Sequence, residues 1–346
     1  MSLAPLKQSA RVRRAQAAMA PLVQRLYRYR RLVPVASFAA GLASFFLVER
    51  QAQLAQWLTA GLFAGWLWLL GEGLFHRWAS RWFGERLPPM ATRFGAQALH
   101  QEALFFVLPF FLVTTTWFSG QIFFTGMLIV AAILSIIDPV YMDQIAARRW
   151  LFFAFHAFSL FAALLVALPI MFQLTVGDSL ALATVAMMIF ALPSIAGVLD
   201  LRRTRRWVLL LVLTLALGGF AWFGRTWIPP ATLRVTEGVI TYRVDAAARE
   251  PGRGVPLVPA QRLSGGLYAF TAIKAPRGLH QPVLHVWEHD GQVVDRIRLH
   301  IVGGRAQGYR AWSHKSEFPA DSGGLWRVLV KTADGQLIGV LHFKVV

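Results

Sequence analysis

Imidazole, indole and guanidinium side chains gather in the last third of the chain, in a pattern that could bind a ligand. The segments 283–289 and 292–301 flank Asp290-Gly291, a dipeptide typical of two-residue hairpin turns. Directly opposed pairing across this turn places three pairs on one sheet face: His285 with Arg296, Trp287 with Val294, and Val283 with Arg298. Such a face suits an anionic or sugar-like ligand, with the indole stacking and the arginines forking onto carboxylate or phosphate. The structural alternative is a solvated face in which Trp287 fills a gap.

A second predicted hairpin, 325–332 with 336–345 around Asp334-Gly335, adds a basic face. Its expected core pairs are Trp326 with Phe343 and Val328 with Leu341. The other face is expected to carry Arg327 opposite His342 and Lys331 opposite Ile338, with Lys344 nearby. The candidate ligand or partner surface therefore comprises His285, Trp287, Arg296, Arg298, Arg310, Trp312 and Arg327.

Catalytic and metal-binding patterns are not apparent in the sequence. The chain has no cysteine, which excludes disulfides, thiolate catalysis and cysteine-ligated metals. A metal held by His285, His289 and His300 is disfavoured, because residues four apart in a strand are roughly 13 Å apart. No Ser-His-Asp order, phosphate-cradling loop or close carboxylate pair is visible. We therefore expect a protein that is not an enzyme and carries no cofactor or metal.

Two ionisable residues fall inside apolar stretches, where a polar group is a functional hypothesis by default. They are Glu72 and His156, and we treat them as a candidate intramembrane polar site. Snorkelling or a buried interhelical hydrogen bond is the structural alternative. A coupled transporter would be expected to show midplane carboxylates or broken helices in matched halves, and neither is evident.

The elements that position these residues begin with apolar stretches long enough to cross a bilayer. Seven spans are predicted, near 32–48, 54–75, 103–118, 121–137, 150–172, 180–199 and 207–224. Basic residues crowd into the N-terminal arm and every second connector after it, 18 in all, against the single Arg50 in the short loops after the first, third and fifth spans. The positive-inside rule then places the N-terminus in the cytoplasm and everything after the seventh span outside it.

This topology divides the chain into a basic cytoplasmic arm (1–31), a seven-helix transmembrane domain (32–224) and an extracytoplasmic domain (225–346). We expect a bacterial inner-membrane protein with a periplasmic C-terminal domain. The net charge of +18 is then a topology signal rather than a nucleic-acid signal. The inward arginines also predict attraction to anionic lipid headgroups at the cytoplasmic face.

The composition changes after Gly224, where Pro229-Pro230 prevents the helix from continuing. Short alternating runs separated by Gly and Pro predict a small all-β, sandwich-like domain. Further strands are expected at 235–244, 267–273 and 308–313, with a long loop over 249–262. The predicted fold is thus a membrane α-helical bundle followed by a β domain.

The stretch 267–346 resembles a bacterial domain family of unknown function, the one numbered twenty-nine fourteen. The similarity is carried by four segments: Ile273-Lys274-Ala275-Pro276, the run from His285 to Gly291, the run from Gly308 to Ser313, and Trp326-Arg327-Val328 with Asp334-Gly335-Gln336 and Phe343. The resemblance implies a compact β domain that often ends a membrane protein. It implies no activity and no catalytic residues.

Two functions are compatible with these features. The first is a membrane-anchored binding protein whose periplasmic β domain holds an envelope protein or glycan, with no role for nucleic acid. The alternative is transport or handling of a small molecule or lipid within the helix bundle, using Glu72 and His156. The two differ in which half of the chain carries the essential residues.

Overall fold

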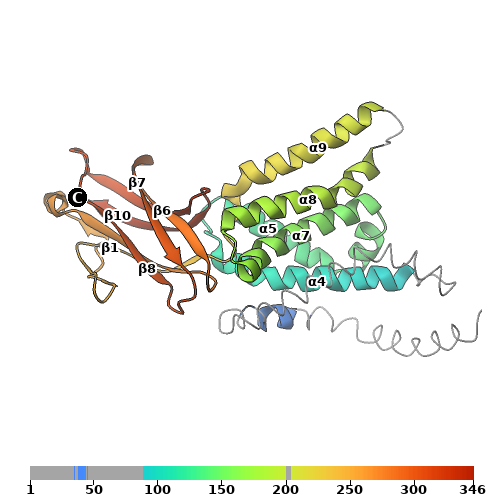
Figure 1. Ribbon diagram of the computed structural model, residues 1–346, viewed down its shortest axis with the longest axis horizontal. Coiled ribbons are helices and arrows are strands. Elements are labelled where there is room, and N and C mark those ends of the chain that lie inside the picture. The colour runs from blue at the N-terminus through green and yellow to red at the C-terminus, as the bar shows by residue number, and fades with distance from the viewer. Residues whose placement is uncertain (1–34, 36–37, 44, 46–88, 200–203) are drawn as a thin grey trace, which may run out of the picture.

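The structure is a computed structural model that describes residues 35, 38–43, 45, 89–199 and 204–346. A helix bundle and a β domain lie end to end along the long axis (Figure 1). The predicted cytoplasmic arm, most of the first predicted span, all of the second and the candidate Glu72 lie outside the described residues.

Helices make up the described chain up to Trp227. They are α4 (Pro89–Thr114), α5 (Gln121–Ile136), α6 (Asp138–Val140), the π-helix η1 (Tyr141–Ile145), α7 (Arg149–Phe172), α8 (Val176–Val198), α9 (Thr204–Phe223) and the 3-10 helix η2 (Gly224–Trp227). Four helical segments are long and apolar enough to cross a membrane: 95–114, 149–172, 176–198 and 205–227. A fifth results if α5 and the segment 138–145, bent by 94° from it, count as one span. The described helices thus provide four or five candidate spans, and seven are not confirmed.

Side-chain burial separates the central helices from the peripheral ones. Most of the apolar stretch is buried in α4 and α7, whereas α8 and α9 leave large apolar side chains such as Val185, Val208 and Phe220 exposed. A bilayer would cover these side chains at no cost, because lipid tails are as apolar as the side chains themselves. The bundle is therefore built as a membrane domain is.

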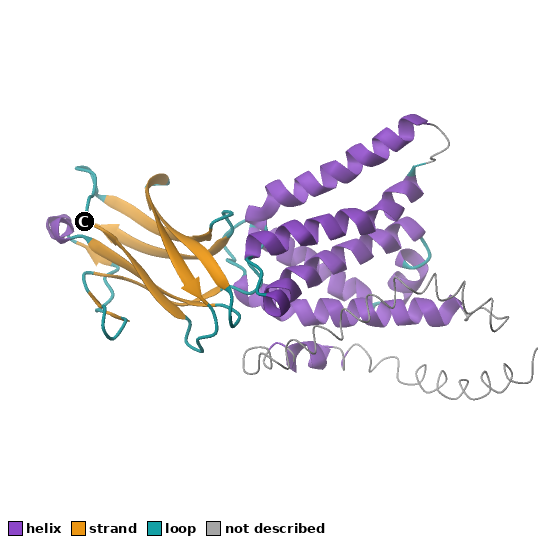
Figure 2. Cartoon of the chain, viewed as in Figure 1, coloured by secondary structure: helices purple, strands orange, loops and turns teal. Residues whose placement is uncertain are grey.

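The β domain is a sandwich of two sheets (Figure 2). One sheet has the order β1-β5-β8, and the other has the order β4-β10-β9-β6-β7. The strands are β1 (Arg234–Thr241), β4 (Leu257–Val258), β5 (Leu267–Lys274), β6 (His280–His289), β7 (Gln292–Val302), β8 (Tyr309–Lys315), β9 (Gly324–Thr332) and β10 (Leu337–Val345). A separate ribbon pairs β2 (Val244–Asp245) with β3 (Glu250–Pro251). β3, β4 and the start of the 3-10 helix η3 (Ala260–Gly265) fall in the region 249–262 predicted as a long loop.

The β9–β10 hairpin follows the predicted register over most of its length. Trp326 pairs with Phe343, Val328 with Leu341 and Arg327 with His342, which confirms those three predictions. The fourth prediction is wrong: Lys331 pairs with Leu337, because the register shifts between Leu337 and Gly339. The core between the sheets contains Trp287, Trp326 and Phe343 with mainly aliphatic neighbours.

Backbone and glutamine contacts join the β domain to the outer end of the bundle. Gln121 at the start of α5 donates to the Leu337 carbonyl at 2.8 Å, and Gln281 of β6 accepts from the Val176 amide at 2.9 Å. Gln336 donates to the Ile228 carbonyl at 3.0 Å. Val176, the first residue of α8, belongs to the apolar core of the β domain. The two regions therefore share buried contacts rather than a flexible linker.

Candidate functional site

The structure divides the predicted ligand surface among three places. His285 and Trp287 are fully buried between the sheets, where they cannot reach a partner. The His285 ring lies 2.9 Å from the Ser313 hydroxyl and 3.1 Å from the Thr271 hydroxyl, and Trp287 donates to the same Ser313 oxygen. These two residues form part of a hydrogen-bonded core, so the prediction that they share a face with Arg296 and Arg298 is wrong.

A β-bulge in β7 explains the error. The tight turn forms as predicted, with positive φ at Asp290 (45°) and Gly291 (85°). The pairing then runs from Glu288 with Val293 to Trp287 with Asp295, which leaves Val294 as an extra residue. One extra residue reverses which side chains face inward. His285 therefore pairs with Ile297 and Val283 with Leu299, while Arg296 and Arg298 point away from the core.

Arg310 and Trp312 lie on β8, in the other sheet. Trp312 stacks on Phe270 of β5 with an interplanar angle of 11°. Arg310 contacts the β2–β3 ribbon, with 3.5 Å to the Glu250 carboxylate and 3.3 Å to the Arg249 carbonyl. These two residues are thus separated by the sandwich from Arg296, Arg298 and Arg327.

The bulge also creates a surface that the predicted register does not contain. It brings Arg296 and Arg298 onto the outer face of the five-stranded sheet, in line with the outward residues of β9 and β10. We call this surface the basic face; its charged or imidazole members are Arg296, Arg298, His300, Arg327, Lys331, His342 and Lys344. All are exposed except Lys331, which is half-buried.

The centre of the basic face is apolar. Two rows cross the four strands: Arg298, Leu284, Lys331 and Leu337, then Arg296, Val286, Leu329 and Val340. A third row, beside these two, contains the acid Glu288 opposite Arg327. Glu288 is buried, and its carboxylate lies 3.0 Å from the Arg327 guanidinium. The other positive charges of the basic face surround the aliphatic strip formed by these rows. None of the ion pairs described for the β domain joins one of these charges to an acid.

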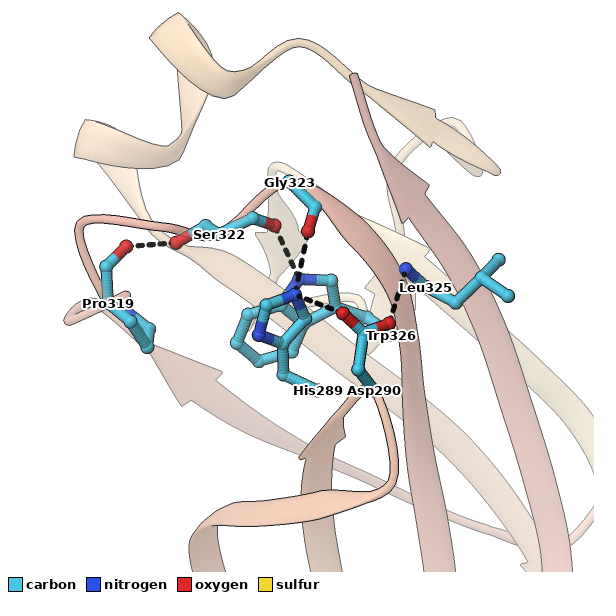
Figure 3. A network of polar contacts seen from close by, with 7 residues as sticks. All are labelled: His289, Asp290, Pro319, Ser322, Gly323, Leu325 and Trp326. Carbon is cyan, nitrogen blue, oxygen red and sulfur yellow. Dashed lines mark hydrogen bonds and ion pairs between the residues drawn. The ribbon is translucent and has the colours of Figure 1, made fainter.

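The end of the sandwich away from the bundle carries a loop held by polar contacts (Figure 3). His289 donates to the Gly323 carbonyl at 2.8 Å and stacks on Trp326. The Trp326 indole donates to the Ser322 carbonyl at 2.8 Å, and Asp290 accepts from the Leu325 amide at 3.2 Å. This loop and η3 line a pocket of about 400 Å³, whose lining includes none of the predicted site residues.

The histidines weighed for metal binding are dispersed. His285 is in the core, His289 is in the distal loop network, and His300 is on the basic face. In the part of the chain that the structure describes, no group of three His, Asp or Glu residues could hold a metal ion.

His156 lies in a polar cluster inside the bundle. Its Nδ1 is 3.1 Å from Nε2 of His100 on α4, and His100 Nδ1 is 2.6 Å from the Tyr141 hydroxyl on η1. Sequence reasoning missed His100 because we expected 76–100 to be a cytoplasmic connector, whereas α4 begins at Pro89. The spacing of Gln97, His100 and Gln101 on one helical face was the available signal. A transport role for the bundle stays a prediction.

Two family models match the chain. One, described as a family of unknown function (DUF5924), matches residues 12–269. The other, described as a protein of unknown function (DUF2914), matches residues 280–345, within the stretch whose resemblance was noted from its motifs. No curated protein and no solved structure matches.

Proposed function

Because the chain belongs to the DUF5924 family of unknown function, we propose its role from geometry: a multi-pass inner-membrane protein whose extracytoplasmic β domain binds an acidic protein partner. The partner binds the basic face of the five-stranded sheet. The bundle serves as the anchor that holds this face at a fixed distance from the bilayer.

The orientation in this proposal rests on the charge asymmetry of the connectors. Arg148 immediately precedes α7 and Arg149 begins it, while Arg205 and Arg206 lie in the first turn of α9; both helices begin at the bundle end opposite the β domain (Figure 1). Basic residues near span ends remain on the cytoplasmic side. The β domain, joined to the other end of the bundle, is then periplasmic in a bacterial cell.

The single observation that carries the binding proposal is the composition of the basic face. Five Arg and Lys residues and two histidines surround an aliphatic strip, and the buried acid Glu288 is already paired with Arg327. The aliphatic residues of this strip are half-buried, apart from the buried Val286. Arginine around a partly accessible apolar centre is typical of protein interfaces, where it forks onto carboxylates. Uncompensated positive charge also speeds the encounter with an acidic partner.

An acidic protein fits this face better than a neutral glycan. Sugar sites commonly stack the ring on an exposed aromatic side chain, and Trp287, the residue expected to do so, is buried. The outward residues of the two central rows are aliphatic or basic.

Charge reversal on the basic face tests the proposal. We expect the double variant Arg296→Glu/Arg298→Glu to lose cross-linked acidic partners in quantitative affinity purification from native membranes. The matched control is Arg253→Glu, which reverses an exposed charge on the loop after β3. Recovery of the same partners by the double variant and by wild type would exclude the basic face. If the double variant loses an anionic polysaccharide and keeps its protein partners, the partner of the basic face is a polysaccharide and not an acidic protein.

A further inference from the structure

Three side chains from three different elements form a continuous hydrogen-bonded chain inside the bundle. The Tyr141 hydroxyl of η1 bonds Nδ1 of His100 on α4 at 2.6 Å, and Nε2 of His100 bonds Nδ1 of His156 on α7 at 3.1 Å. His100 and Tyr141 are 0 % exposed and His156 is 4 % exposed. Both nitrogens of His100 are therefore used by partners that can themselves give or take a proton.

The backbone is broken where it delivers Tyr141. The chain bends by 94° after α5, Pro139 lies in the first turn of the next segment, and η1 closes with a π-type bond from the Ala146 amide to the Tyr141 carbonyl at 2.7 Å. π-helical turns are rare and occur frequently at functional sites. A regular helix continuing from α5 would not direct Tyr141 toward His100 in this way.

Aromatic rings pack around the two imidazoles. Phe152 lies parallel to the His156 ring with centroids 6.1 Å apart, and Phe190 of α8 meets the same ring at 5.8 Å. Phe155 meets the His100 ring at 5.1 Å. Ring contacts from α7 and α8 therefore enclose the histidine pair in the described part of the bundle.

The described elements around the pair supply few other titratable groups. Tyr141 comes from η1, and α8 and α7 present phenylalanines. The carboxylate of Asp138 is linked to this face of α4, because its Oδ1 accepts from Gln97 at 3.0 Å. Gln97 also donates to the Ser135 carbonyl, as does Gln101. The polar side of α4 thus leads from the bend at Asp138 toward the histidine pair.

The hydrogen bonds that link Tyr141, His100 and His156 can run in either of two donor-to-acceptor directions. A neutral imidazole donates from one nitrogen and accepts at the other. In one direction, the Tyr141 hydroxyl donates to His100 and His100 donates to His156. In the other, His156 donates to His100 and His100 donates to the Tyr141 oxygen.

We propose that Tyr141, His100 and His156 form a buried proton relay, a site whose ligand is the proton. One proton arrives at Nε2 of His156, a second passes from His156 Nδ1 to His100 Nε2, and a third passes from His100 Nδ1 to the Tyr141 oxygen. The original Tyr141 hydroxyl proton leaves. Only N–H and O–H bonds form and break, one proton enters as one leaves, and no electron is transferred.

Proton flux through the full-length protein in liposomes tests the relay. Vesicles with an entrapped pH-sensitive dye and a potassium diffusion potential should acidify at least ten times faster with wild-type protein than without protein. His156→Asn keeps a hydrogen-bonding amide that cannot pass a proton, and it should lower the protein-dependent flux at least tenfold. Tyr141→Phe should also lower it, and His280→Asn, which changes an exposed histidine of the β domain outside the basic face, should leave it unchanged. Flux that equals that of protein-free vesicles, or that survives His156→Asn, overturns the proposal.

A second measurement uses wild-type protein alone and so does not depend on whether a variant folds. Nitrogen-15 spectra of histidine-labelled protein in bilayers should show His100 and His156 taking up one proton as a unit, because two cations 3.1 Å apart repel each other. Independent titration of the two rings, or a single fixed tautomer from pH 8 to pH 4, overturns the relay.

Discussion

The β domain and the helix bundle each bury histidine, but they surround it differently. In the β domain, His285 lies between the hydroxyls of Thr271 and Ser313. In the bundle, His100 lies between the hydroxyl of Tyr141 and the ring of a second histidine. His285 has no second imidazole among its hydrogen-bond partners, so a proton on its ring has no second ring nitrogen to pass to. Partner chemistry, rather than burial, separates a structural histidine from a relay.

The same contrast predicts opposite responses to mutation. Removing His285 should harm folding of the β domain and leave proton movement intact. Removing His156 while keeping a hydrogen bond should do the reverse. Each prediction below strengthens or breaks this distinction.

The largest expected effect on stability is that of His285→Ala. The change leaves a cavity in a fully buried site and removes a partner from the Ser313 and Thr271 hydroxyls. We expect a loss of about 3 kcal/mol in the free energy of unfolding of the β domain. Hydrogen exchange of the β9 amides in the full-length protein measures it. The control His280→Ala changes an exposed histidine of the same strand and should cost less than about 0.5 kcal/mol. Equal protection in the two variants would show that His285 is not a structural element.

Acid should destabilise the β domain through the same residue. Burial lowers the pKa of His285 from its usual 6.5 to about 4. Between these values the unfolded chain binds a proton that the folded domain does not, so stability is complete above pH 6.5 and falls as the pH drops toward 4. The loss from pH 7 to pH 5 is about 2 kcal/mol.

Exchange of the β9 amides at the two pH values, corrected for intrinsic rates, measures this loss. The glutamine in His285→Gln can form hydrogen bonds but does not titrate. The loss of stability between pH 7 and pH 5 should therefore be smaller in this variant than in wild type by about 2 kcal/mol. An unchanged pH dependence in this variant would assign the acid sensitivity to other groups.

Much of this architecture could be predicted from the sequence, for identifiable reasons. The β9–β10 hairpin follows from alternation and a turn dipeptide, which are local signals. Apolar length likewise predicts α7 and α8 nearly as observed. In both cases the pattern within one segment determines its structure.

The sites could not be predicted in the same way, because they depend on single-residue events and on contacts between distant segments. The extra residue Val294 has no signature in the turn before it, yet it moves His285 into the core and Arg296 out of it. The relay joins residues 41 and 56 positions apart. The π-helical turn that delivers Tyr141 has no marker beyond Pro139.

A smaller effect is expected where the two regions meet. Gln281→Leu removes the acceptor of the Val176 amide and leaves a buried donor unpaired at the start of α8. We expect a loss of about 1 kcal/mol in local protection of that end of α8, measured by hydrogen exchange. The control is Gln292→Leu, which changes an exposed residue of β7, the strand that pairs with β6. It should leave this protection unchanged. Unchanged protection in Gln281→Leu would mean that the β domain docks on the bundle through apolar contacts alone.

The smallest effects should come from two ion pairs of the β domain, Arg310 with Glu250 and Arg327 with Glu288, and these two should differ. Arg310 and Glu250 are 3.5 Å apart with the carboxylate largely exposed, so Arg310→Ala should cost less than about 0.5 kcal/mol. Arg327→Ala should cost more, about 1 kcal/mol, because it leaves the buried Glu288 carboxylate without its guanidinium. Hydrogen exchange of the β5 and β9 amides in the full-length protein, measured at increasing urea concentration, compares the stability costs of the two variants. Equal costs would mean that water reaches Glu288. The basic face would then carry a solvated acid beside Arg327, which would weaken its preference for an acidic partner.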